Sequence, residues 1–141
     1  MAITAELTLT SAAGGLTTDA LALSTTTTLT KTGTSTAVEH TTGLARAAVK
    51  STAKGTTSGQ ITLYTGDDYA AIAYLYIKNI ATTAGHKIYV YDDTTSGDPI
   101  QFQLDALDWA FIPMHGDKTY KAYSPGGNDP IVEWMVIGVD Q

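Results

Sequence analysis

Three histidines, His40, His86 and His115, are the side chains best suited to acid–base chemistry. They lie far apart in the sequence and form neither an HExxH motif nor a paired-histidine spacing, which is typical of surface and turn histidines. The chain also lacks a Gly-x-Ser-x-Gly nucleophile elbow, a glycine-rich phosphate loop and a dinucleotide fingerprint. We therefore expect no enzymatic activity, no catalytic residue and no cofactor.

Carboxylates in turns form the second chemically capable set. Asp67-Asp68, Asp92-Asp93 and Asp98 could gather around a calcium ion, because hard cations prefer several oxygen ligands. The Asp-x-Asp-x-Asp-Gly loop of calcium sites is absent from the sequence, and aspartate is common in solvated turns. We expect solvated turn aspartates and no metal site, with calcium binding as the alternative.

Two strand-like segments carry paired tyrosines. Tyr74 and Tyr76 lie two residues apart, as do Tyr89 and Tyr91, so each pair shares one face of an extended strand. The four rings would form a tyrosine patch if the two strands were neighbours. Sheet packing or a subunit contact is the favoured interpretation, and a carbohydrate platform is the alternative. Tyr89 and Tyr91 are therefore candidate interface residues.

The elements that position these side chains come from a chain whose composition divides in two. Of 25 threonines, 20 lie in residues 1–66, whereas 11 of the 12 aromatic residues lie in residues 67–141. Large aromatic side chains supply much of a core, so we expect the folded body at residues 58–141. Residues 1–57 are expected to form Thr-rich strands or an arm that packs on the body or on a neighbour, within one structural domain overall.

The body shows strand periodicity interrupted by turn-forming residues. Apolar and polar residues alternate in several short segments, and Ile131–Val139 is apolar on both faces, which predicts a central strand. The predicted fold class is all-β: an antiparallel β-sandwich, jelly-roll-like, with an extended Thr-rich N-terminal region. The expected core consists of Leu63, Leu75, Ile77, Ile88, Val90, Phe102, Phe111, Val136 and one of Trp109 and Trp134.

Three local patterns mark the N-terminal part. Apolar residues alternate with polar ones from Ile3 to Leu9, which predicts a strand or an extended arm suited to strand addition. Threonine occupies every second position from Thr26 to Thr36, which predicts a threonine ladder if that segment is extended. Residues 44–50 could form two helical turns, too short to be stable alone. The candidate interface residues of the arm are Ile3, Ala5, Leu7 and Leu9.

Four segments of the body carry a resemblance to a known group of proteins. They are Ala73–Asn79, Ile88–Tyr91, Trp109–Pro113 and Ile131–Val136. Their order is similar to that of small β-sandwich virion proteins of tailed bacteriophages, cyanophages among them. The resemblance implies a structural role without catalysis, as in capsid cement or decoration proteins. No functional residue is carried over, because the shared pattern consists of strands and turns.

The expected partners follow from this resemblance and from the charge. We expect a capsid decoration protein on the exterior of the virion, binding itself as a homo-oligomer and the major capsid protein or other virion proteins. A trimer is favoured because capsid shells present threefold junctions. The net charge of −6 argues against nucleic acid and anionic membranes as partners. The alternatives are a tail or head–tail (neck or fibre) component and a carbohydrate-binding module on the virion.

Overall fold

The computed structural model describes residues 2–13, 20–30, 40–41, 44–50, 52–55, 59–66, 72–93, 99–115 and 118–138. These residues contain eleven β-strands and no helix. The chain divides into two compact units, Met1–Val38 and Glu39–Gln141. Within the described residues, no helix is long and apolar enough to cross a bilayer.

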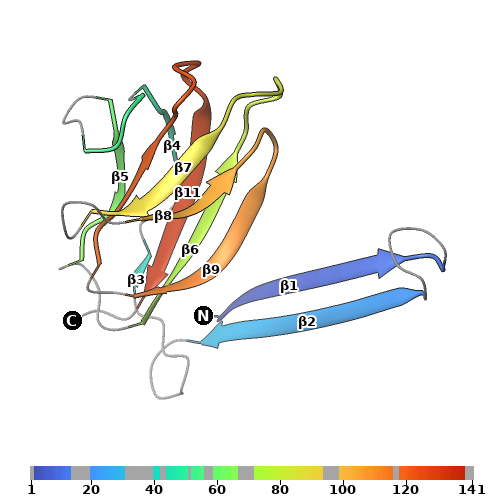
Figure 1. Cartoon of the computed structure of the whole chain (residues 1–141). Coiled ribbons are helices and arrows are strands. Elements are labelled where there is room, and N and C mark those ends of the chain that lie inside the picture. The colour runs from blue at the N-terminus through green and yellow to red at the C-terminus, as the bar shows by residue number, and fades with distance from the viewer. Residues whose placement is uncertain are drawn as a thin grey trace. The chain divides into compact units, whose positions relative to one another are not determined.

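Two antiparallel sheets make up the second unit, and they face each other as a β-sandwich (Figure 1). The first sheet contains, in spatial order, β5 (Ile61–Tyr64), β10 (Tyr120–Tyr123), β7 (Ile88–Asp92) and β8 (Ile100–Leu104). The second sheet contains β3 (His40–Thr41) and β4 (Ala45–Ala48), then β11 (Ile131–Gly138), β6 (Ile72–Asn79) and β9 (Trp109–His115). The all-β antiparallel sandwich is thereby confirmed, and the jelly-roll connectivity stays a prediction.

Strand alternation builds the core between the sheets. Ile88 and Val90 on β7 point inward and are fully buried, as are Leu75 and Ile77 on β6. The predicted core is confirmed for Leu63, Leu75, Ile77, Ile88, Val90 and Val136. Phe102 is half-buried and packs against this core.

The predicted core was wrong for Phe111, and of the two tryptophans Trp134 is the one that packs against the core. Phe111 is half-buried but lies on the opposite face of its sheet, where it stacks on Tyr74 with ring centroids 5.8 Å apart. Of the two tryptophans, Trp134 packs against the core and donates from Nε1 to the carbonyl oxygen of Leu63, 3.1 Å away. Trp109 is 53% exposed. The rings of Trp109 and Phe111 therefore lie on the outward face of their sheet and are not part of the core.

β11 is a central strand, as its apolar pattern predicted. It pairs with β6 on one edge and with β4 and β3 on the other. From the sequence, residues 44–50 could form two helical turns, but Ala45–Ala48 form strand β4. Pairing with the edge of β11 gives these residues hydrogen-bond partners for their backbone groups, which a helix of four residues would not provide. β3 and β4 both precede the expected boundary at 57/58, and both pair with the body.

The first unit contains a two-stranded antiparallel ribbon. β1 (Ala2–Ser11) pairs with β2 (Leu21–Thr30) along ten residues of each strand. The predicted strand at residues 3–9 is therefore present, and its partner is a strand of the same chain. The threonine ladder begins inside β2, where Thr26 and Thr28 pair with Glu6 and Thr4, and its remainder from residue 31 onward lies outside the described residues.

Candidate functional site

The outer face of the second sheet carries one row of side chains across four strands. The strand register aligns Trp109 of β9 with Lys78 of β6, Lys78 with Glu133 of β11, and Glu133 with Arg46 of β4. Their inward neighbours line the core, so all four point away from the sandwich. A tryptophan, two cations and a carboxylate thus lie side by side on a β-sheet surface.

Aromatic side chains extend this row along the strands. The next row aligns Phe111, Tyr76 and Met135, and in the row beyond it Tyr74 pairs with Pro113. Tyr74 and Phe111 stack with an interplanar angle of 8°. We call this surface the outer aromatic face, and define it by Tyr74, Tyr76, Trp109, Phe111 and Met135.

Glu133 is the polar centre of the outer aromatic face. Its Oε2 accepts a hydrogen bond from Nε of Arg46 at 2.6 Å, and its Oε1 accepts one from the Tyr76 hydroxyl at 2.9 Å. These two bonds hold the pKa of the Glu133 carboxyl below its ordinary value, with the Tyr76 bond as the larger cause. Burial raises the pKa of Tyr76, and the bond to Glu133 raises it further. Carboxylate and neutral phenol are therefore held together over the neutral pH range.

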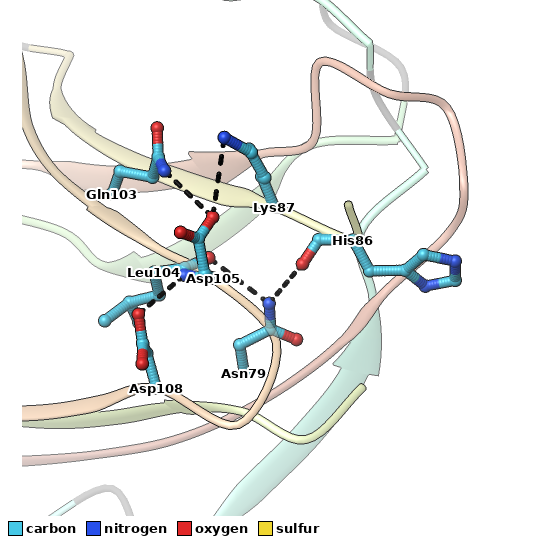
Figure 2. A network of polar contacts seen from close by, with 7 residues as sticks. All are labelled: Asn79, His86, Lys87, Gln103, Leu104, Asp105 and Asp108. Carbon is cyan, nitrogen blue, oxygen red and sulfur yellow. Dashed lines mark hydrogen bonds and ion pairs between the residues drawn. The ribbon is translucent and has the colours of Figure 1, made fainter. Parts of the chain in front are cut away.

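The start of β9, and with it Trp109, is positioned by a buried amide. Asn79 is fully buried at the end of β6, and its Nδ2 donates to the carbonyl oxygens of His86 at 2.6 Å and Leu104 at 3.2 Å (Figure 2). Its backbone N–H donates to the carbonyl of Asp108, one residue before Trp109, at 2.9 Å. The side chain thus joins β6 to the segment before β7 and to the end of β8, and the backbone N–H joins β6 to the turn that leads to β9.

The turn between β8 and β9 is itself tightly hydrogen-bonded. The backbone N–H of Asp105 donates to a carboxylate oxygen of Asp108 at 3.0 Å, and Lys87 and Gln103 both contact Asp105 (Figure 2). Leu107 between them has a φ of 70°, in the left-handed region that leucine rarely adopts, and it is exposed. Leu107 in this turn and Trp109 just after it are both exposed apolar residues.

The arrangement suits recognition of another macromolecule. Tryptophan, tyrosine and arginine are the residues most enriched among those that dominate binding at protein interfaces. Glu133 holds Arg46 and Tyr76 in place before any partner arrives, which reduces the side-chain entropy lost on binding. Within the described residues, no group of three or more His, Asp or Glu side chains could hold a metal ion.

The predicted tyrosine patch does not form. Tyr74 and Tyr76 belong to the second sheet, whereas Tyr89 and Tyr91 belong to the first. The condition for that patch is not met, because the chain crosses from one sheet to the other between β6 and β7 instead of making a hairpin. Period-two alternation assigns a residue to a strand face, but it does not say which sheet the strand joins.

Tyr89 and Tyr91 lie on the outer face of the first sheet, where each makes an edge-to-face contact with Tyr123. Tyr91 is 0% exposed, its hydroxyl donates to Oε1 of Gln60 at 2.8 Å, and Lys54 lies 5.1 Å from its ring centroid. Burial raises the pKa values of Tyr91 and Tyr123. Of the two predicted interface tyrosines, only Tyr89 offers exposed surface in this chain.

The predicted arm residues Ile3, Ala5, Leu7 and Leu9 all lie on β1, where they pair with Leu29, Thr27, Thr25 and Leu23. Leu7 and Leu9 are exposed, and Ala5 is half-buried. Only backbone pairing is described for Ile3. The structure thus brings the arm residues together and keeps them in a different unit from the tyrosines.

The remaining chemically capable residues are dispersed. Asp92 forms an ion pair with Lys118 at 3.8 Å, and Asp93 pairs with Lys121. Asp67, Asp68 and Asp98 lie outside the described residues, as does the side chain of His40. His115 is exposed at the end of β9, and His86 is half-buried in the segment before β7.

The polar residues that organise this site, Arg46, Asn79 and Glu133, were not identified from the sequence. A signal for Glu133 existed, because it is the one acidic residue in the apolar segment Ile131–Val139. A lone carboxylate in such a strand needs a partner to be buried. That partner, Arg46, lies 87 residues earlier, beyond the reach of a local pattern.

Comparison with protein-family models, with curated proteins and with solved structures found no match to this chain.

Proposed function

We propose that this protein is a non-catalytic structural component of a tailed-bacteriophage virion, a decoration protein that binds the exterior of the capsid as a homo-oligomer. The row Trp109–Lys78–Glu133–Arg46 on the outer aromatic face is the observation that carries the proposal. It supplies a rigid, aromatic contact surface on a small β-sandwich. The resemblance of the sequence to virion proteins is the reason for proposing a phage particle as the place of action.

The partner at this face is the major capsid protein. Lys78 and Arg46 outnumber Glu133, so the row has a positive balance in a chain whose net charge is −6. That local balance suits an acidic patch on the shell, with Trp109 seated in an apolar pocket. Binding at many equivalent sites of the shell lets an oligomer combine weak contacts into firm attachment.

The experiment is immunogold labelling of intact phage particles released by cells that carry the gene. Label over the capsid exterior supports the proposal. Label confined to the tail or neck overturns the capsid placement, and particles without label overturn the virion role. Cosedimentation of the purified protein with capsid shells then measures binding directly.

A matched pair of variants assigns that binding to the outer aromatic face. Trp109→Ala removes the exposed ring of the row, whereas Ile100→Ala removes an exposed apolar side chain on the other sheet. We expect Trp109→Ala to weaken cosedimentation at least tenfold and Ile100→Ala to leave it within twofold, the range of a hot-spot residue against a neutral one. Equal effects would remove the outer aromatic face from the proposal.

A carbohydrate-binding module is the second candidate function, and the exposed Trp109 ring on the surface of a β-sheet favours it. An indole face stacks on the apolar face of a sugar ring, and Lys78 lies directly beside it to donate hydrogen bonds. Glycan binding that Trp109→Ala abolishes, without cosedimentation with shells, would favour this function over capsid decoration.

A further inference from the structure

The two faces of the β1–β2 ribbon have opposite chemistry. One face presents Ala5, Leu7 and Leu9 from β1, with Thr25 and Leu23 opposite Leu7 and Leu9. We call this the leucine face. The other, here called the threonine face, presents Thr4, Glu6, Thr8, Ser24 and Thr26. The ribbon is thus amphipathic, although the described residues of its own unit contain no second sheet that packs on it.

Within the described part of the ribbon unit, nothing packs on the apolar side chains of the leucine face. Leu7, Leu9 and Leu23 are 39%, 46% and 44% exposed. A two-stranded ribbon is at best marginally stable in water, and stability requires further strands or packing against another element. Each ten-residue strand is about twice the usual strand length, so the face that requires a cover is long.

The distribution of charged residues along the chain indicates what packs on the leucine face. In the described part of the ribbon unit the one ionisable side chain is that of Glu6, and it lies on the threonine face. Residues 39–141, in contrast, carry 12 acidic and 7 basic side chains. Copies of this chain repel one another through their bodies but not through their leucine faces. A neutral face of leucine and small residues is complementary to itself.

The size of the face indicates how many copies meet. Ten residues span about 33 Å, and two strands are about 10 Å wide, so each leucine face measures roughly 330 Å². Two faces together hide about 660 Å², well below the roughly 1,200 Å² of a stable interface. Three ribbons around one axis hide about 1,000 Å², which comes closer to that lower bound, and each face then contacts two others.

We propose that the leucine face of the ribbon packs against the same face of two other copies, which makes the ribbon the trimerisation element of the protein. The inference deepens the homo-oligomer of the proposed function and does not depend on the capsid as the partner. It also changes the role first expected of β1. The strand already pairs with β2 along its length, so the contact uses side chains of a ribbon face rather than a free strand edge.

The first test measures the mass of the purified full chain by light scattering at micromolar concentration. We expect about 44 kDa, three times the 14.8 kDa of one chain. The double substitution Leu7→Thr and Leu9→Thr introduces β-branched residues, which favour strands, and it is expected to lower the mass to that of one chain. The matched control, Thr4→Ser with Thr8→Ser, alters the threonine face of the same strand and is expected to stay trimeric.

A second test does not depend on weakening the ribbon. The chain has no cysteine, so a single introduced cysteine can be cross-linked only between copies. Ala5→Cys on the leucine face is expected to form linked dimers with a short bismaleimide reagent. Thr8→Cys on the threonine face is expected to stay monomeric on a denaturing gel.

The outcomes separate this inference from the capsid proposal. A single-chain mass for the unaltered protein, or equal cross-linking of the two cysteine variants, would overturn the inference. A two-chain mass would overturn the trimer. If the protein is a trimer that dissociates on the leucine substitutions but labels no capsid, the inference stands and the capsid proposal alone is overturned.

Discussion

The hydroxyl of Tyr76 donates a hydrogen bond to Oε1 of Glu133, 2.9 Å away on the neighbouring strand β11. Because Arg46 on β4 binds the other oxygen of that carboxylate, three strands are joined on the outward side of their sheet. Hydrogen bonds to a charged group are among the stronger ones in proteins. This joint holds the side chains of Arg46, Tyr76 and Glu133 in fixed positions relative to one another.

Replacement of Tyr76 by phenylalanine tests the strength of the joint. The change removes one hydrogen bond to a carboxylate and leaves the ring in place, so we expect a loss of about 1.5 kcal/mol in the free energy of unfolding. Urea unfolding followed by circular dichroism measures it. Tyr74→Phe, two residues earlier on the same face, is the control and should change stability by less than about 0.5 kcal/mol. Equal losses in the two variants would show that the bond to Glu133 contributes nothing.

Acid should weaken the same joint. The pKa of Glu133 is lower in the folded chain than its ordinary value of 4.5, so its contribution is fully present above pH 4.5 and is lost as the pH falls through the folded value. The difference in unfolding free energy between the unaltered protein and Glu133→Gln should therefore shrink as the pH falls below 4.5. A difference that stays constant through this acid range would contradict the prediction.

Asn79 should be the most sensitive polar residue of the body. Asn79→Leu fills the site but leaves the carbonyls of His86 and Leu104 without their donor, and we expect a loss of about 2–4 kcal/mol. Asn79→Asp should destabilise at neutral pH and recover in acid, because a carboxylate faces two carbonyl oxygens until it is protonated. Gln103→Ala, which removes an exposed member of the same network, is the control and should change stability by less than about 0.5 kcal/mol. Thermal unfolding across the pH range measures all three.

The sequence predicted the strands of the body well, because most of them are short, alternate with period two and end at turn-forming residues. The segment Ile100–Leu104, in which apolar and polar residues alternate, is β8, and the segment from Ile131, which is apolar on both faces, is the central strand β11. Phe111 was misassigned for a physical reason. Alternation separates two faces, but an aromatic residue can occupy either of them, and Phe111 lies on the outward one.

The candidate site was less predictable because it depends on which strands become neighbours. β6 and β7 are consecutive but join different sheets, whereas β11 pairs with β4 from far along the chain. No local sequence pattern determines which strands pair, because the backbone of any strand can form these hydrogen bonds. Residues 45–48 show the same effect, because an alanine-rich segment takes its conformation from the edge of β11.

The two tryptophans should respond to substitution in opposite ways. Trp134 packs against the core and donates to Leu63, so Trp134→Ala should cost about 3–5 kcal/mol in unfolding free energy, as for other large core residues. Trp109 is 53% exposed, so Trp109→Ala should cost less than about 1 kcal/mol while it weakens binding at the outer aromatic face. Fluorescence quenching by acrylamide provides the check, because Trp109 should be strongly quenched in Trp134→Phe and Trp134 weakly quenched in Trp109→Phe. A folded Trp134→Phe whose remaining fluorescence resists acrylamide would show that Trp109 is covered in solution, and the outer aromatic face would then be closed to a partner.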